Sequence, residues 1–536
     1  MKTKKGLALL LAAAMIASSF AGCKNNAASD EQSTPQQQSQ QQSSSAERQS
    51  ESKTAPATKL SILAPYGSNE YDDNEYFLEW LNDIQKMTNT ELSWEFYDSN
   101  SYYEKLTLKY ATGELASIMV TDKNAEFLNA CKYNVFWELS NYLDLFNNLS
   151  VIPDAVRENA SANGELYGIP RSRNLGRNAW AYRQDWADNL GIGHPETLED
   201  LYEMAVAFTN NDPDGNGKND TYGFAFDGWT GMWTMMMMWF GVPNVWGIDE
   251  NDNLEYYAMT DEYLTALKWF RQIYSEGLLP SDFRYIKAGD ADKQLLRNNI
   301  CGIVGQVAEI PRKAQDNMVG SEEAPGLYPE ARFTYFTGVD AGYGINTFPT
   351  AGYAGLVSIT KQYVKTEDEL MGALAFLNAT GNADVQMLMY SGYEGKDYYV
   401  DENGYKVVYS ADEKTAMGYS APNYRDGWGQ IIPFWSCEEE AAKIPQIEAA
   451  SDIRKAEAAI KVENEKHVVA NYGASYSSET YVNIGADLDD IINTSLLDYI
   501  EGKIDEVGLQ SQLKQWWEAG GETVTAEMNA LYHQYK

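Results

Sequence analysis

Apolar runs and polar turns alternate along most of the chain in a way that predicts strands followed by helices. Short apolar runs bounded by turn residues predict strands at 59–63, 92–97, 116–121 and 355–360. After the first of them, apolar side chains recur with helical spacing on one face, at Phe77, Trp80, Leu81, Ile84 and Met87. Strands that alternate with helices are typical of parallel sheets, so the pattern predicts an α/β fold.

The C-terminal part of the pattern is helical. Apolar residues recur at three- and four-residue spacing through 488–496 and 509–516. A double glycine at 520–521 then interrupts the series before a last helix over 524–531. A further apolar stretch, 228–242, is shorter than a membrane span and predicts a buried helix.

The N-terminus has the pattern of a signal peptide. Three lysines within the first five residues precede an apolar run over 7–20 that is too short to span a bilayer comfortably. Residues 1–22 are therefore expected to be removed on export. Ala21-Gly-Cys23 resembles a bacterial lipobox, which implies a lipidated Cys23, although Phe20 stands where an aliphatic residue is usual. Ordinary secretion with Cys23 left free is the alternative.

Residues 23–57 have the composition of a tether. The segment is rich in Ser, Gln, Ala and Asn and cannot bury a core. A flexible tether behind a lipid anchor predicts a globular body held at the extracellular face of the cell membrane. Contact with the membrane would then be through the anchor only.

The charge of the chain disfavours several classes of partner. Lys and Arg number 41 against 78 Asp and Glu, which gives a formal net charge of −37. Nucleic acid, anionic lipid and polyanionic glycans are unfavourable partners on electrostatic grounds. The three histidines lack metal-ligand spacing. Cys131, Cys301 and Cys437 are interpreted as buried apolar residues, and one disulfide pair among them stays open.

One loop spaces oxygen ligands as a calcium loop does. The ligand positions 1, 3, 5, 7 and 9 correspond to Asp212, Asp214, Asn216, the carbonyl of Lys218 and Asp220. Gly217 takes the sharp-turn position, but Gly223 replaces the bidentate Glu at position 12, so the loop is not a whole EF-hand. The loop is predicted to bind a structural Ca²⁺ ion between a helix and a strand. A solvated turn rich in Asp and Asn is the alternative.

Catalytic motifs are missing from the sequence. The chain has no Walker A loop, no HExxH helix and no G-x-S-x-G elbow, and Gly342-Tyr-Gly344 lacks the third glycine of a dinucleotide-binding loop. With 78 acidic residues a glycosidase-like pair could be chosen anywhere, so their abundance is no evidence for one. The sequence therefore predicts a binding protein and not an enzyme.

Aromatic residues are abundant and clustered. The chain has 37 Tyr and 14 Trp, with Trp229, Trp233, Trp239 and Trp246 in one region and Trp428 in another. Sugar rings stack on flat aromatic side chains, so these clusters indicate a carbohydrate cleft. Core packing is the alternative for each ring. It is favoured for Trp239 and about equally weighted for Trp229, Trp233 and Trp428.

Taken together, several segments resemble the extracellular solute-binding proteins of family 1, the lipoprotein receptors that deliver sugars to ABC importers in Gram-positive bacteria. Their order and spacing, from about residue 58 to the C-terminus, carry the resemblance. Besides the lipobox-like segment and the calcium-type loop running into Thr221-Tyr-Gly223, they are Glu165-Leu-Tyr-Gly-Ile-Pro-Arg171, Tyr182-Arg-Gln-Asp-Trp-Ala-Asp-Asn-Leu-Gly191, Pro195-Glu-Thr-Leu-Glu-Asp-Leu201, Tyr390-Ser-Gly-Tyr-Glu-Gly395, Ile500-Glu-Gly-Lys503 and Trp516 onward to Gly521.

The resemblance implies a two-lobe periplasmic-binding-protein-like fold with hinge crossings, a cleft between the lobes and a helical C-terminus. Lobe 1 is expected at 58–175 plus 355–395, and lobe 2 at 176–354 plus 396–536. Closure of the lobes on ligand would be the signal that the importer recognises. The implied role is capture of an oligosaccharide, expected to be neutral, by a monomer that delivers it to the permease of an ABC importer.

Ligands of open α/β lobes gather beyond the carboxyl ends of strands, which nominates loop residues near the first strand and the first crossing. The resemblance adds the Trp229/Trp233 region and Glu394. The predicted ligand-binding residues are Tyr66, Asn69, Arg171, Arg173, Trp229, Trp233, Glu394 and Trp428. For the arginines, salt-bridge roles are at least as well supported. A receptor of the same fold for peptides or another solute is the nearest alternative function, and a surface glycan hydrolase is a more distant one.

Overall fold

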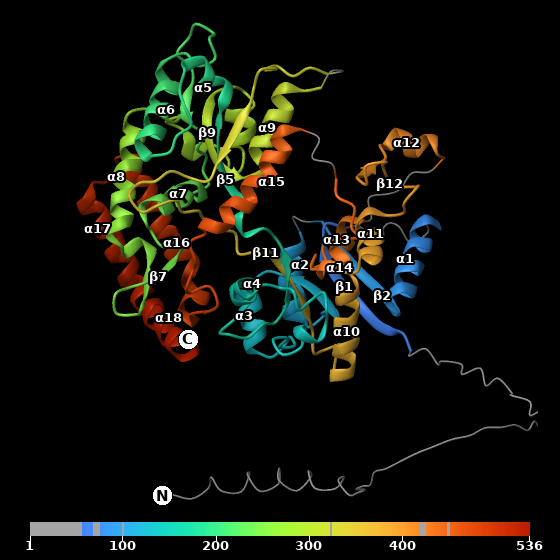
Figure 1. Cartoon of the computed structure of the whole chain (residues 1–536). Helices are drawn as coiled ribbons and strands as arrows, with labels where there is room; N and C mark the ends of the chain where they lie inside the picture. The colour runs from blue at the N-terminus through green and yellow to red at the C-terminus, as the bar shows by residue number, and fades with distance from the viewer. Residues whose placement is uncertain (1–55, 68–74, 99–100, 322–323, 419–424, 448–450) are drawn as a thin grey trace, which may run out of the picture. The chain divides into compact units, whose positions relative to one another are not determined.

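The structure is a computed structural model that describes residues 56–67, 75–98, 101–321, 324–418, 425–447 and 451–536. Residues 56–536 fold as two α/β lobes, each with its own sheet and its own hydrophobic core. In Figure 1 the blue and orange parts of the chain share one lobe, and the green and red parts share the other. The predicted α/β class and two-lobe architecture are therefore confirmed.

The first lobe is built on a five-stranded sheet in the order β2-β1-β3-β11-β4. Its strands are β1 (Thr58–Pro65), β2 (Thr90–Tyr97), β3 (Ile118–Thr121), β4 (Ile169–Ser172) and β11 (Tyr353–Ile359). Its helices are α1 (Glu75–Thr88), α2 (Tyr102–Thr112), α3 (Ala125–Lys132), α4 (Asp154–Ala160), α10 (Glu367–Ala379), α11 (Ala383–Ser391), α12 (Ala411–Ala416), α13 (Arg425–Gly429) and α14 (Glu438–Ala441), with a small hairpin of β12 (Tyr398–Val400) and β13 (Lys406–Val408).

The second lobe is built on a four-stranded sheet in the order β10-β5-β9-β6. Its strands are β5 (Asn178–Arg183), β6 (Tyr222–Phe224), β9 (Cys301–Val307) and β10 (Phe333–Phe336), and β7 (Trp246–Ile248) pairs separately with β8 (Leu254–Tyr256). Its helices are α5 (Gln184–Leu190), α6 (Leu198–Asn210), α7 (Gly231–Met237), α8 (Asp261–Ser275), α9 (Glu309–Val319), α15 (Asp452–Asn464), α16 (Glu479–Ile500), α17 (Glu506–Trp516) and α18 (Glu522–Tyr535).

Local sequence signals explain many of these elements. Phe77, Trp80 and Ile84 are fully buried on the inner face of α1, as the helical spacing predicts. Thr197 and Asp200 form the capping box that starts α6. The Thr197 side chain accepts from the backbone N–H of Asp200, and the Asp200 side chain accepts from the backbone N–H of Thr197. The C-terminal helices are present, and Gly520 has φ +143° at the break before α18.

The sheets are mixed and not purely parallel. β1 pairs in parallel with β2 and β3, and β6 pairs in parallel with β9. By contrast, β11 runs antiparallel to β3 and β4, and β5 runs antiparallel to β9 and β10. The antiparallel pairs all involve strands next to a crossing between lobes, where the chain enters a sheet without a βαβ turn.

The lobes are joined where the chain passes from β4 to β5, from β10 to β11, and from α14 to α15. The first two crossings are hydrogen bonded to each other: Arg173 N donates to Gly352 O and Thr350 N donates to Leu175 O, both at 2.9 Å. From α15, buried Asn464 donates its Nδ2 to the carbonyl of Asn178 at 2.6 Å. These contacts tie three separate chain segments into one hinge region.

The first core extends beyond the expected lobe boundary at Gly395. Trp428, Ile431 and Ile432 pack in it with Trp80 and Phe96. Residues 425–441 therefore also belong with the first lobe, because the indole of Trp435 donates to Pro170 O at 2.6 Å and Glu440 accepts from Ala383 N at 2.8 Å. No local pattern predicts this return, since the segment lies after the hairpin of β12 and β13.

Two further predictions can be checked within the part of the chain that the structure describes. Cys131, Cys301 and Cys437 are all free thiols, and the first two are buried. The stretch 228–242 folds as α7 and a following 3₁₀ turn in the second core. Among the described helices, none combines the length and apolar character needed to cross a bilayer.

Candidate functional site

The carboxyl ends of the parallel strands bring polar and aromatic residues to the crossings. Tyr66 follows β1, Asp122 follows β3, Trp229 lies just after β6, and Glu309 follows β9. The first crossing, which carries Arg171, Arg173 and Arg177, connects the two sheets beside these ends. Loops at the carboxyl ends of strands are where open α/β folds bind ligands, so this region is the candidate functional site.

On the side of the first lobe, Tyr66, Tyr103, Asp122 and Arg171 form one polar cluster. Tyr66 is 53% exposed and has φ +63°, a strained conformation for a bulky residue that is found mostly where function requires it. The Tyr103 hydroxyl interacts with the Asp122 carboxylate; burial, then that carboxylate, raises the pKa of Tyr103. Burial, and then Arg173, lowers the pKa of Arg171 to about 10.

Three arginines, Arg171, Arg173 and Arg177, lie close together in sequence at the first crossing. Arg171 donates from Nη1 to Ala354 O at 2.9 Å, and Arg173 donates from Nη1 to Ser172 O at 2.7 Å. Both guanidinium groups thus use a backbone carbonyl, and neither has an ion pair within the described residues. Burial, followed by repulsion from Arg177, lowers the pKa of Arg173.

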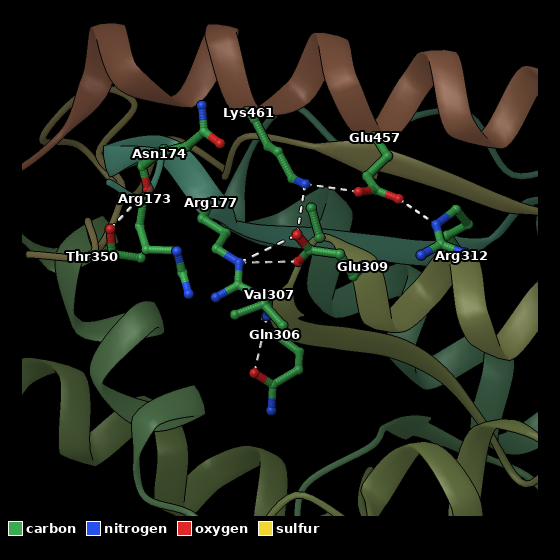
Figure 2. Close-up of polar contacts among 12 residues, drawn as sticks. Arg173, Asn174, Arg177, Gln306, Val307, Glu309, Arg312, Thr350, Glu457 and Lys461 are labelled. Carbon is green, nitrogen blue, oxygen red and sulfur yellow. Dashed lines mark hydrogen bonds and ion pairs between the residues drawn. The ribbon is translucent and has the colours of Figure 1, made fainter. Parts of the chain in front are cut away.

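The third arginine is held by an ion-pair network on the second lobe (Figure 2). Arg177 Nε lies 3.2 Å from a Glu309 carboxylate oxygen, and Lys461 from α15 lies 2.8 Å from the same carboxylate. Lys461 also contacts Glu457, which pairs with Arg312 of α9. The network binds α15 against α9 and fixes the direction of the Arg177 side chain.

Trp229 lies in a loop that the Asp227 side chain holds in place through hydrogen bonds. The buried Asp227 carboxylate accepts hydrogen bonds from Trp229 N at 2.8 Å, Gly289 N at 2.9 Å and Ala291 N at 3.1 Å. A Cβ at Gly231 would lie 2.0 Å from the Trp229 ring, so the ring lies directly on this glycine. Trp229 stays half-exposed at the end of β6 and can offer a ring face to a ligand.

Other predicted ligand residues lie elsewhere. Trp233 is fully buried and stacks on Phe226 with ring centroids 3.8 Å apart. Trp428 is fully buried between Trp80 and Phe96. Neither ring has a face open to a sugar in this structure, which agrees with the core-packing alternative.

The two remaining predicted positions add little to the site. Glu394 is exposed in the turn that leads to β12, and Asn69 lies outside the described residues. Residues that the sequence did not single out are Tyr103, Asp122, Arg177, Gln306 and Tyr390. Asp122 follows β3 and Gln306 lies near the end of β9, and these positions could have signalled them. Tyr103 lies in α2 and Tyr390 in α11, where no local signal marks a ligand residue.

A cavity of 1040 Å³ borders the crossings between the lobes, where Leu175 and Thr350 line it. Its lining comes from both lobes and includes Lys123, Asn159, Trp246, Tyr472 and Tyr481. Lys123 donates to Asn159 O at 3.2 Å and to Ala474 O at 2.6 Å, and burial lowers its pKa to about 8. The cavity contains none of the crossing arginines, so we treat it as a contact region between lobes and not as the primary site.

The predicted calcium loop is closed by its own hydrogen bonds. Asp212 accepts from Asn216 N at 3.0 Å and from Gly217 N at 2.9 Å. The Asn216 Nδ2 lies 3.0 Å from Asp214 Oδ2 and 3.1 Å from Asp220 Oδ1. Burial, with Asp212 and Asp220 close by, raises the pKa of Asp214. Two carboxylates thus contact the side-chain amide of Asn216, and Asp212 accepts from its backbone N–H, so three carboxylates gather where a cation could bind.

Whether these residues fit a metal ion depends on that amide. In the part of the chain that the structure describes, no group of three or more His, Cys, Asp or Glu side chains is arranged to hold a metal. However, the amide nitrogen and oxygen of Asn216 exchange places by a half-turn of the side chain, and their assignment follows the hydrogen bonds around them. With the oxygen turned inward, at the cost of the hydrogen bond that it accepts from Lys218 N at 2.8 Å, the loop would offer only oxygen ligands, as a hard cation requires.

Comparison with known proteins adds a family match. Residues 79–395 match the family model described as "Bacterial extracellular solute-binding protein". That range includes most of the first lobe, the first two crossings and the sheet of the second lobe.

Relatives and solved structures are similar over nearly the whole chain. The chain is 33% identical to lipoprotein LipO of Bacillus subtilis over 91% of this chain and 95% of that protein. It is 28% identical to the polygalacturonan/rhamnogalacturonan-binding protein YtcQ of the same organism, over 85% and 88%. Among solved structures, an EF-hand mutant of the Streptococcus pneumoniae protein FusA with fructo-nystose superposes with a TM-score of 0.61, at 18% identity, over 89% of this chain and 99% of that one.

Proposed function

This chain belongs to the bacterial extracellular solute-binding proteins, and from that premise we propose that it captures an oligosaccharide between its two lobes and delivers it to the permease of an ABC importer. The observation that carries the proposal is that each lobe has polar and aromatic residues at or just beyond the carboxyl ends of its strands: Tyr66 and Arg171 in the first lobe, and Trp229 and Gln306 in the second. A solute that contacts both groups stabilises the closed arrangement of the lobes.

The chemistry of these residues suits a sugar. Tyr66 is exposed and Trp229 is half-exposed, so both can stack on the apolar face of a sugar ring. The arginines and Gln306 can donate hydrogen bonds to hydroxyl oxygens. YtcQ is named for binding polygalacturonan and rhamnogalacturonan, and FusA was solved with fructo-nystose, so carbohydrate is the solute class that the relatives favour.

The hinge supports a binding role and needs no covalent chemistry. Three chain crossings restrain sliding of the lobes while permitting bending, and the paired backbone of the first two crossings gives the bend an axis. We therefore assign no reaction to the site. The family is described as solute-binding and YtcQ is named a binding protein, which supports this reading.

Anchoring and metal binding complete the proposal. We propose that Cys23 is the lipidated first residue of the mature protein and that residues 23–57 tether the lobes to the cell surface; LipO is named a lipoprotein, which supports the anchor. Asp212, Asp214, Asn216, Asp220 and the Lys218 carbonyl would hold Ca²⁺, which would supply the positive charge that the loop lacks. The EF-hand named for FusA supports this assignment.

The test is thermal unfolding of the purified chain against a panel of oligosaccharides, with a peptide library as the second arm. A ligand at a hundred times its dissociation constant stabilises the folded state by about 2.7 kcal/mol. We expect a clear rise in Tm with one class of glycan and no release of new reducing ends. A rise with peptides alone would contradict the sugar assignment, and new reducing ends would contradict a pure binding role.

A further inference from the structure

The first crossing presents hydrogen-bond donors without matching acceptors. Arg171 is 6% exposed, yet its Nε has no hydrogen-bond partner and its Nη1 contacts only a backbone carbonyl. A buried donor without a partner costs free energy, and a charged one costs more. Such a group is expected where a ligand supplies the missing acceptor.

The neighbouring side chains also present hydrogen-bond donors without acceptors. Figure 2 shows the guanidinium groups of Arg173 and Arg177 and the amide of Gln306 directed to the same side of the crossing. Arg177 uses Nε for Glu309, and Gln306 uses its oxygen to accept from Val307 N at 2.9 Å. What remains on that side is the Arg177 Nη groups and the Gln306 Nε2, which can only donate.

The acidic groups near the crossing do not cancel this charge. Asp122 interacts with Tyr103 and faces Arg171 across Gly355, where a Cβ would lie 3.3 Å from Asp122 Oδ1 and 3.6 Å from Arg171 Nη1. Glu309 is shared between Arg177 and Lys461. Of the three arginines, Arg177 alone has an ion pair among the described residues, and its Glu309 partner is also bound by Lys461, which contacts Glu457 as well.

We propose that the side of the first crossing lined by Arg171, Arg173, Arg177 and Gln306 binds a carboxylate group, so that the oligosaccharide taken up by this protein contains uronic acid residues. This inference rests on the proposed function. It names the substrate class of that same site, and it differs from the neutral sugar that the net charge favours. Planar guanidinium groups pair with carboxylates in a bidentate way, which gives the site direction as well as charge.

The net charge of −37 is no obstacle to an acidic ligand. At physiological ionic strength the field of a surface charge falls off over about 8 Å, so the groups that line the site decide what binds there. Steering from a distance would oppose an acidic ligand and slow its association. The name of YtcQ, which refers to polymers of galacturonate, is consistent with this chemistry.

The experiment compares ligands that differ in charge alone. Binding of the purified chain to tri-galacturonate, to its methyl ester and to tri-galactose is measured by calorimetry at low and high salt. We expect the free acid to bind at least ~10-fold more tightly than the ester, since a hydrogen bond to a charged partner is about twice as strong as a neutral one. Added salt should weaken binding of the acid only.

Variants locate the effect. Arg173→Gln keeps a polar, half-exposed side chain and should weaken binding of the acid by roughly 10- to 100-fold while binding of the ester changes little. Arg332→Gln is the matched control, because that arginine is exposed and paired with Asp188 away from the crossing.

The outcomes separate the two proposals. If the ester or tri-galactose binds as tightly as the acid, or if Arg173→Gln weakens all three ligands equally, the carboxylate site is wrong and the sugar receptor stands. If no glycan binds while a peptide or other solute does, both the function and this inference are overturned.

Discussion

The acidic loop at 212–220 and the basic side of the first crossing are opposites in charge and in construction. The loop has three carboxylates hydrogen bonded to Asn216, all within residues 212–220. The crossing has three arginines with too few acceptors, and Gln306 joins them from a different strand. In each region charges of one sign outnumber those of the other, and in both cases a ligand can supply the balance. The difference is that one is local and the other exists only in the folded chain.

The largest effect is expected from reversing one charge at the crossing. Arg173→Glu places a carboxylate opposite the proposed uronate, and like charges brought together cost several kcal/mol. Binding of tri-galacturonate should fall by about 100-fold or more in calorimetry. Lys218→Glu is the control in the other region, since Lys218 is predicted to contribute only its backbone carbonyl to the loop. Equal loss in both variants would show a nonspecific effect of charge.

Removing calcium should destabilise the loop at 212–220 and leave ligand binding at the crossing unchanged. If the loop binds Ca²⁺, saturating calcium raises the free energy of unfolding by about 2.7 kcal/mol at a hundred times the dissociation constant. Asp220→Asn should abolish most of that rise in thermal unfolding. Asp249→Asn is a matched control, because Asp249 also accepts backbone N–H groups in a turn but has no carboxylate cluster. A calcium response that survives in Asp220→Asn would place the metal elsewhere.

Overpacking at Gly176 should disturb the crossing and leave calcium binding by the loop unchanged. A Cβ at Gly176 would lie 2.3 Å from Lys461 O and 2.6 Å from Glu465 N, so Gly176→Ala must push α15 away from the first crossing. Forced overpacking of this kind typically costs about 1–3 kcal/mol. Denaturant unfolding should show the loss of stability, and acid binding should weaken while the calcium response is retained. Unchanged stability would mean that α15 moves without cost.

The smallest effect concerns a cation that can lose its charge. Burial lowers the pKa of Lys123 to about 8, below the value of about 10.4 for a free lysine. The unfolded chain therefore holds this proton more tightly, and stability should rise as pH increases from about 8 to 10.4. Lys123→Met should remove this rise when unfolding is compared between pH 7.5 and 10.

The sequence predicted the elements better than the site. Helical spacing located α1 and the C-terminal helices, and the cap at Thr197 located the start of α6, because these signals lie within a few residues. The sequence could not tell whether Trp229 or Trp233 is exposed to ligand. The two rings are four residues apart in a segment of the same composition, and either could face the core or a ligand. The second core buries Trp233, and the clamp at Asp227 leaves Trp229 half-exposed.

The residues of the crossing could be predicted from the sequence only in part, for a related reason. Arg171 and Arg173 could be nominated because they follow a strand, but nothing local shows that they lack partners. That fact depends on β11 and β9, which come much later in the chain. The return of Trp428 to the first core was missed on the same grounds.

The position of β11 has a consequence for how the protein is made. This strand lies between β3 and β4, although both are synthesised long before it. Until Ile359 is available, the first sheet has two open edges facing each other, and open edges pair readily with other chains. Early chains are thus prone to aggregate if they collapse too soon. A polypeptide that must stay unfolded until it is complete suits a route in which folding begins only after translocation.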